Sequence, residues 1–162
     1  MRMLRIILFL TFLSTSFVVA QESPATTQPS DKTDTKATVY IYRYKQFAGS
    51  AITPSVYCDE MQLAKMENGR YFTVRVNPGK HVFRSEDKQA GVELDLKAGQ
   101  QYFIRVEIAT GLLKGHGRLL LVASEQGSYE MRSSKLRPLD SSRVVDASLV
   151  SLDEARLQAD PK

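Results

Sequence analysis

Cysteine and histidine are scarce in this 162-residue chain, which has one cysteine and two histidines. One cysteine cannot form an internal disulfide, so a disulfide-stapled small domain is excluded, as are zinc sites built from paired cysteines. Cys58 shares a predicted strand face with Val56, where a thiol packs as a small apolar group, and we expect it to be buried. Pairing with another molecule outside the cell is the alternative. His81 and His116 lie far apart without a ligand cluster nearby, so we predict no metal site and no cofactor.

Recognisable catalytic motifs are missing as well. The chain has no Gly-x-Ser-x-Gly elbow, which argues against a serine hydrolase. The glycine-rich segment 111–117 lacks the Gly-Lys-Ser/Thr ending of a phosphate loop. Lys and Arg number 22 against 18 Asp and Glu, without the concentrated basic face of a nucleic-acid binder. We therefore predict a non-catalytic protein that binds no nucleic acid; an extracellular enzyme with an unrecognised site is the alternative.

Acidic residues are absent from the first twenty positions, which contain Arg2 and Arg5, an apolar run and a Val-Val-Ala ending. This pattern predicts a signal peptide over residues 1–20, cleaved before Gln21. An uncleaved membrane anchor is the alternative, but the apolar stretch is short for a spanning helix. A lipid anchor would require cysteine at position 21. We expect an exported protein, periplasmic or extracellular, that is not lipid-anchored and not integral to the membrane after cleavage.

The rest of the chain divides by composition into three parts. Residues 21–37 contain no aromatic or large aliphatic side chain, which predicts a disordered tether. Residues 38–139 contain all seven tyrosines and all nine glycines and form the predicted domain. Residues 140–162 form a predicted polar tail, in which a capping box at Ser151 favours a short helix from Leu152 to about Ala159.

Glycines at turn-like spacing separate β-branched and aromatic runs in the predicted domain, a rhythm typical of all-β folds. We predict an antiparallel β-sandwich of about seven to eight strands. The strands are expected near residues 38–44, 55–58, 62–66, 70–76, 81–85, 92–96, 101–108 and 118–124. Asn77-Pro78-Gly79-Lys80 predicts a type II turn followed by a hairpin partner. Residues 128–136 fit either a helical turn or an edge strand.

One strand carries a row of tyrosines that could serve as a binding surface. Tyr40, Tyr42 and Tyr44 alternate with Val39 and Ile41, and Arg43 lies beside them. Such a row could stack on sugar rings or bases, or anchor a protein partner. Packing against the rest of the protein is the more common use of strand tyrosines. Tyr40, Tyr42 and Arg43 are therefore candidate binding residues, with packing as the favoured alternative.

A series of short motifs resembles a known family. The series runs Val39-Tyr-Ile-Tyr-Arg43, Val56-Tyr-Cys-Asp59, Leu63-Ala64, Asn68-Gly69-Arg-Tyr71, Asn77-Pro-Gly-Lys-His81 and Ala98-Gly-Gln-Gln-Tyr102. In order and spacing it is similar to the bacterial exported domain of unknown function 2846, from Ala37 to about Pro138. Cys58, in place of a hydrophobic strand residue, and Gln21 depart from the family pattern. The resemblance implies an immunoglobulin-like or prealbumin-like β-sandwich without catalytic residues. A protein or another envelope component is the expected partner.

Overall fold

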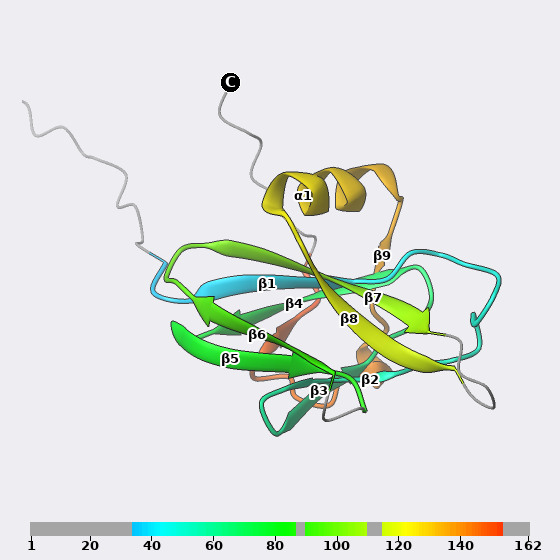
Figure 1. The fold of residues 1–162 in the computed structure, drawn as a ribbon, viewed down its shortest axis with the longest axis horizontal. Helices are drawn as coiled ribbons and strands as arrows, with labels where there is room; N and C mark the ends of the chain where they lie inside the picture. The colour runs from blue at the N-terminus through cyan, green and yellow to red at the C-terminus, as the bar shows by residue number, and fades with distance from the viewer. Residues whose placement is uncertain (1–33, 87–89, 110–114, 154–162) are drawn as a thin grey trace, which may run out of the picture. The chain divides into compact units, whose positions relative to one another are not determined.

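The computed structural model describes residues 34–86, 90–109 and 115–153, which form two β-sheets and one α-helix (Figure 1). The first sheet has the order β10-β4-β1-β7-β8, with β9 also paired to β4, and the second has the order β3-β2-β5-β6. The strands are β1 Ala37–Tyr42, β2 Ser55–Cys58, β3 Met61–Lys65, β4 Arg70–Val76, β5 Gly79–Arg84, β6 Gly91–Leu96, β7 Gln101–Ala109, β8 His116–Val122, β9 Arg137–Pro138 and β10 Val150–Ser151. The predicted signal peptide and most of the predicted tether lie outside the described residues.

Side-chain alternation along the strands builds the main core between the two sheets. Val39 and Ile41 of β1 point to the same side as Val74 of β4, and all three are fully buried. Val56 of β2 and Phe83 of β5 contribute from the other sheet to the same cluster. Each sheet thus buries one apolar face against the other. The predicted all-β, two-sheet architecture is confirmed.

The strand pairing corrects two expectations from the sequence. The first sheet is mixed, because β1 pairs with β7 in parallel and β4 with β9 in parallel. The segment Asn77-Pro78-Gly79 does not form a hairpin either: β4 pairs with β1, whereas β5 pairs with β2 and β6. The chain crosses from one sheet to the other at Gly79, whose φ of 133° differs from the value near 80° of a type II turn. Proline and glycine allow a bend, but they do not select the strand that follows as a partner.

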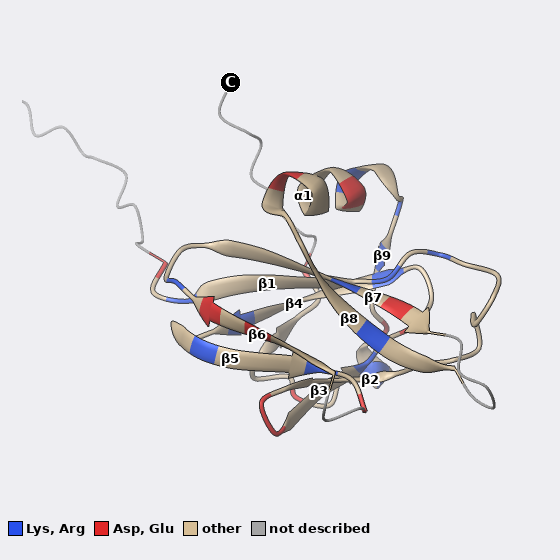
Figure 2. Ribbon diagram, in the orientation of Figure 1, with Lys and Arg blue, Asp and Glu red and all other residues tan. Residues whose placement is uncertain are grey.

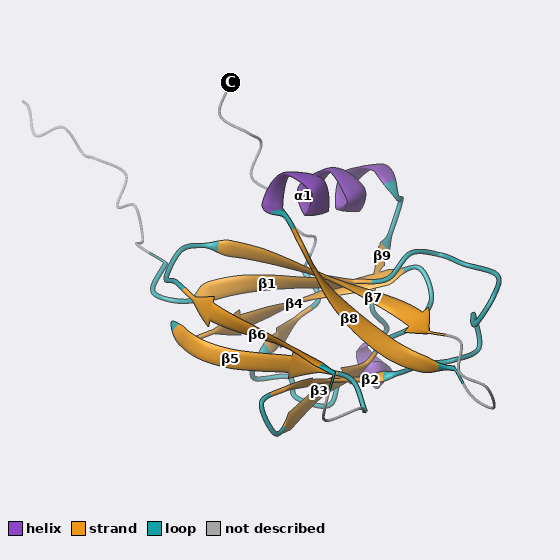
Figure 3. Cartoon of the chain, viewed as in Figure 1, coloured by secondary structure: helices purple, strands orange, loops and turns teal. Residues whose placement is uncertain are grey.

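Helix α1, Ser124–Ser133, covers the outer face of the first sheet (Figure 3). A second apolar cluster lies beneath it, formed by Tyr40, Tyr42, Tyr71, Phe103, Val122 and Met131. Gly127 lets the helix approach closely, because a Cβ at this position would lie 2.3 Å from Cγ of Phe103. The segment that the sequence left open as helix or strand thus contains the end of α1 and is followed by β9.

The segment after Leu139 differs from the predicted polar tail. A 3-10 helix, η1 Ser141–Arg143, leads to β10, which pairs with β4 at the edge of the first sheet. Val144, Leu149, Val150 and Leu152 pack against the main core. Ser151 ends strand β10, and its hydroxyl oxygen accepts a hydrogen bond of 3.3 Å from the Asp153 N–H. The predicted helix beyond Asp153 lies outside the described residues, so this prediction is not tested. At the other end, Ala37 is fully buried in β1 and belongs to the fold, not to the tether.

Candidate functional site: a basic pocket beside β9

The tyrosine row predicted as a possible binding surface lies largely beneath α1. Tyr40 is 4% exposed and stacks on Phe103 with ring centroids 4.9 Å apart, and Tyr42 is fully buried. The Tyr42 hydroxyl donates a hydrogen bond of 2.5 Å to Oε2 of Glu130 on α1. Burial, followed by this bond to a carboxylate, raises the pKa of Tyr42 well above its ordinary value. Tyr40 and Tyr42 therefore serve packing, which is the alternative that the sequence favoured.

Arg43, the third candidate binding residue, is 1% exposed and supports a loop. Its guanidinium donates hydrogen bonds to the backbone carbonyls of Ile52, at 2.6 Å, and Gly49, at 2.8 Å. Burial lowers the pKa of Arg43 from its ordinary value. This side chain ties the segment between β1 and β2 to the first sheet and presents no surface to a ligand.

The structure brings His81 next to Cys58 and Asp59, which are adjacent to each other in the sequence. Cys58 at the end of β2, Asp59 in the following turn and His81 on β5 place Sγ, Oδ2 and Nδ1 within 4.8 Å of one another. Asp59 has a φ of 54°, and its Oδ1 accepts a hydrogen bond of 2.9 Å from the Val82 N–H. Burial raises the pKa of Asp59, but the bonds from Val82 and His81 outweigh it, and the pKa is lowered overall.

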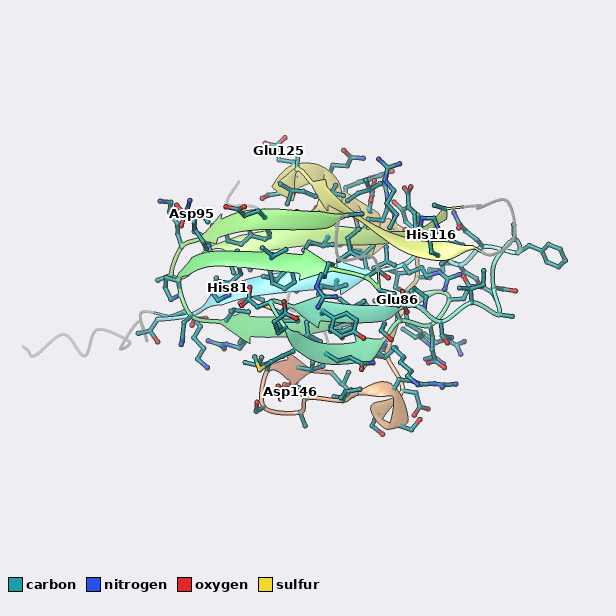
Figure 4. All side chains as sticks on the ribbon, turned by 60° about the horizontal axis from the view of Figure 1, so that its bottom comes forward. His81, Glu86, Asp95, His116, Glu125 and Asp146 are labelled. Carbon is teal, nitrogen blue, oxygen red and sulfur yellow. The ribbon has the colours of Figure 1, made fainter. Side chains whose placement is uncertain are left out.

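This cluster lacks the geometry of a catalytic triad. In a triad the nucleophile and the carboxylate contact opposite nitrogens of the histidine. Here Asp59 and Cys58 both face Nδ1, at 2.9 and 4.0 Å, while Nε2 lies 3.0 Å from the backbone oxygen of Asn77. Burial and the neighbouring Asp59 charge raise the pKa of Cys58 to about 12. The predicted burial of Cys58 is confirmed, and its thiol is not activated as a nucleophile. His116 lies on β8, apart from this cluster (Figure 4).

A pocket of about 430 Å³ lies where β9 meets the start of β4. Four cationic side chains line it, together with Asn68, Gly69 and Ser134; they are Lys45, Arg70, Lys135 and Arg137. Among the described residues, the lining contains no Asp or Glu. Figure 2 shows basic segments gathered in this region, around β9 and the adjoining end of β4. We refer to it below as the basic pocket.

Three separate chain segments form the basic pocket, and backbone contacts fix their positions. The Arg137 N–H donates to the Gly69 carbonyl at 3.2 Å, which joins β9 to the turn before β4. Asn68 exchanges two hydrogen bonds with the backbone of Gln46, at 2.7 and 2.9 Å, and so holds the loop that carries Lys45. Gly69 has a φ of 72°, and a Cβ there would lie 3.1 Å from Cβ of Lys45. The pocket wall is therefore fixed by backbone geometry as well as by side chains.

The positive charge of the basic pocket is only partly compensated within the described residues. The parallel register places Arg70 opposite Arg137, and the Arg70 guanidinium donates a hydrogen bond of 3.0 Å to the Pro138 carbonyl. Arg70 lies 3.9 Å from Glu67, but the same carboxylate contacts Arg143 more closely, at 3.2 Å. Lys45, Lys135 and Arg137 form no ion pair with any described residue. The C-terminal end of α1 adds only about half a negative charge.

A second pocket, of about 630 Å³, lies at the start of β8 and is lined by residues that include Ile52, Pro54, Glu86 and His116. Both carboxylate oxygens of Glu86 already accept hydrogen bonds, from the Ser55 N–H and the Ser85 hydroxyl. Residues 87–89 and 110–114, which adjoin this lining, lie outside the described residues. The basic pocket is the better defined of the two.

The basic pocket is not predictable from the sequence, because its residues come from three distant segments. The local signal was limited to Asn68-Gly69-Arg70 and to the basic residues on both sides of Leu136. Neither pattern indicates a site until β9 is paired with β4.

The fold and site define a two-sheet β protein with one covering helix and a basic pocket. The chain belongs to the family described as "Protein of unknown function (DUF2846)", whose model matches residues 33–117. The match contains Lys45, Asn68, Gly69 and Arg70 of the pocket but ends before α1 and β9. No curated protein and no solved structure matches the chain. Among the described residues, no helix is long and apolar enough to cross a bilayer.

Proposed function

We propose that the protein is an exported, non-catalytic module of the bacterial cell envelope that binds a phosphate-bearing component through the basic pocket. The observation that carries this proposal is the position of Arg70 opposite Arg137, beside Lys45 and Lys135, with no acidic residue among the described residues of the lining. Four cations around one pocket repel one another, and an anion bound among them lowers this repulsion and stabilises the folded state.

The donor set favours phosphate over a single carboxylate. Two guanidinium groups can each donate two parallel hydrogen bonds to phosphate oxygens, and two ammonium groups add point charges. A phosphate carries more negative charge than one carboxylate and so compensates more of the positive charge of the four cations.

The phosphate could belong to a lipid headgroup or to a soluble or polymeric component. Phe47, two residues after Lys45, is 100% exposed and could enter a lipid surface beside a bound headgroup.

Neutralisation of the basic pocket is the first test of this function. We expect the protein that begins at Gln21 to bind inorganic phosphate and vesicles that contain an anionic phospholipid. The double variant Lys135→Gln/Arg137→Gln should weaken both interactions at least tenfold. The matched control Lys80→Gln/Lys97→Gln removes two exposed lysines that have their own acidic neighbours, Glu93 and Asp95, each at 3.8 Å. An equal loss in both double variants would show nonspecific charge attraction and contradict the proposal.

A second comparison separates the two sources of phosphate. Phe47→Ala removes the exposed ring and leaves the four cations in place. If the ligand is a lipid headgroup, this variant binds vesicles less tightly and binds inorganic phosphate unchanged. If the ligand is a soluble component, both interactions are unchanged. Loss of phosphate binding in Phe47→Ala would contradict the assignment of binding to the basic pocket.

Export of the protein rests on the predicted signal peptide and is tested separately. We expect the protein recovered from cells to begin at Gln21, and mass measurement of the intact chain checks this. Recovery of a chain that still carries residues 1–20 would support the uncleaved anchor instead.

A further inference from the structure

Three different metal-ligating atom types meet at the junction of β2 and β5. Cys58 Sγ lies 3.9 Å from Asp59 Oδ2 and 4.0 Å from His81 Nδ1, and Oδ2 and Nδ1 are 2.9 Å apart. This cluster is distinct from the basic pocket, whose lining shares no residue with it. The proposed phosphate-binding function does not use it.

The remaining polar atoms of Asp59 and His81 are occupied by backbone groups. His81 Nε2 lies 3.0 Å from the carbonyl oxygen of Asn77, an acceptor, so Nε2 carries the proton. A metal-bound histidine is typically oriented in this way, with its second nitrogen donating to a carbonyl or carboxylate. Asp59 Oδ1 accepts from the Val82 N–H, and the Asp59 N–H donates to the Val82 carbonyl at 2.7 Å. The backbone therefore holds both side chains with Nδ1 and Oδ2 directed at each other.

Two atoms with lone pairs that face each other at 2.9 Å require a cation between them. A proton on Nδ1 meets this requirement for Asp59 and His81 alone. It does not use the thiol of Cys58, whose Sγ lies 3.9 Å from Oδ2 and 4.0 Å from Nδ1. A metal ion would use all three.

We propose that Cys58, Asp59 and His81 form a binding site for a divalent metal ion of the zinc type, with Sγ, Oδ2 and Nδ1 as ligands and water in the fourth position. Mixed sulfur, nitrogen and oxygen donors suit zinc, whereas magnesium and calcium prefer oxygen donors alone. On binding, the Cys58 S–H bond breaks and the sulfur–metal bond forms, while the metal displaces the proton between Nδ1 and Oδ2, so two protons pass to solvent.

The distances fit this assignment with small adjustments. Zinc bonds of about 2.0–2.3 Å place tetrahedral ligand atoms about 3.3–3.7 Å apart. The observed separations of 2.9, 3.9 and 4.0 Å lie on either side of this range.

The exposure of the three residues indicates an entry path for the ion. Cys58 is 1% exposed, the His81 side chain 19% and the Asp59 side chain 46%. An ion would enter beside Asp59 and reach the sulfur last.

Titration with metal alone, in phosphate-free buffer, tests the site. We expect calorimetry to show one equivalent of Zn²⁺ bound, and Co²⁺ to give a thiolate-to-metal charge-transfer band. Cys58→Ser should abolish that band, and His81→Gln should weaken Zn²⁺ binding at least tenfold. His116→Gln is the matched control, because it removes the other histidine and should leave both signals unchanged. Circular dichroism confirms that each variant is folded.

Asp59→Asn keeps the proposal testable if the other variants unfold, since asparagine tolerates the positive φ of position 59. This variant should retain the fold and bind Zn²⁺ at least tenfold more weakly. No saturable Zn²⁺ binding by the folded wild-type protein would overturn the proposal. Equal binding by wild type and Cys58→Ser, or loss of binding in His116→Gln, would overturn it as well.

Discussion

Glu130 connects α1 to the sheet beneath it through several hydrogen bonds. Its carboxylate accepts bonds from the Tyr42 hydroxyl at 2.5 Å, Arg105 at 2.9 Å and Gln126 at 2.7 Å. Burial raises the pKa of Glu130, but the bonds from Tyr42, Tyr44, Gln126 and Arg105 outweigh it, and the pKa is lowered overall. The folded state therefore holds this proton less tightly than the unfolded state. The stabilisation is complete above the ordinary pKa of 4.5 and is lost as pH falls through the lowered folded-state pKa.

Glu130→Gln should reduce the free energy of unfolding at pH 7 by about 2 kcal/mol, because hydrogen bonds to a charged group are replaced by neutral ones. The variant should also lose part of the acid sensitivity of wild type below pH 4.5. Urea unfolding at pH 7 and at pH 3 measures both effects. Glu125→Gln, at an exposed position of the same helix, is the control. Identical pH profiles for wild type and Glu130→Gln would refute this role of the buried carboxylate.

Arg43→Ala should destabilise the protein by about 2–4 kcal/mol, since it leaves a cavity and two loop carbonyls without a donor. Arg43→Lys should be intermediate, because an ammonium group lacks the planar fork that reaches both oxygens. Thermal and urea unfolding give the comparison. Arg118→Ala, at an exposed position of β8, should change stability by less than about 0.5 kcal/mol. A loss in Arg43→Ala no larger than in Arg118→Ala would contradict this assignment.

The burial of a side chain is predictable from the sequence where strand alternation alone decides it. Strand period placed Cys58 with Val56 in the core, and both are buried. It failed for His81, whose contact with Asp59 depends on the pairing of β2 with β5. That pairing depends on the burial of apolar residues that are distant in the sequence. The spacing of Cys58, Asp59 and His81 therefore does not indicate it.

The packing of helix α1 on the first sheet depends on close contact between Gly127 and Phe103. Gly127→Ala should lower the free energy of unfolding by about 1–3 kcal/mol, although alanine favours helix by about 1 kcal/mol, because its Cβ overlaps the Phe103 ring. Chemical denaturation provides the measurement. Tyr129→Ala, at a position 67% exposed on the same helix, should be close to neutral. Stabilisation by Gly127→Ala would show that α1 does not pack as described.

The C-terminal strand gives a second prediction for the elements. A chain that ends at Leu139 should be less stable by about 3 kcal/mol or more, since Val144, Leu149, Val150 and Leu152 no longer cover the core. It also loses the pairing of β10 with β4. A chain that ends at Asp153 is the matched control and keeps these contacts. Equal melting temperatures for the two chains would contradict this prediction and support the domain boundary at Leu139 that the sequence suggested.

Strand positions were predictable and strand partners were not. Eight strands of the described residues, β1 to β8, fall close to the runs of β-branched and aromatic residues, because such residues suit a half-buried pleated surface. Strands β9 and β10 have only two residues each, too few for a periodic signal. Both strands pair with the edge of β4 that β1 leaves free, and the sequence does not show which edge is free.

Across the whole molecule, the family match includes most strands of both sheets but only part of the basic pocket. The matched residues 33–117 include β1 to β7, whereas α1, β9 and β10 follow the match. The sequence therefore predicted a two-sheet β architecture and the family. It did not predict the basic pocket, which needs the paired surfaces of β4 and β9 and the loop that carries Lys45.

A phosphate titration followed by NMR backbone amide shifts measures phosphate binding by the basic pocket residue by residue. Inorganic phosphate at constant ionic strength should produce saturable shifts at residues 68–70 and 134–137, and Lys135→Gln/Arg137→Gln should remove them. Chloride at the same ionic strength should produce none. Shifts that do not saturate, or that arise elsewhere with these residues unchanged, would contradict the account.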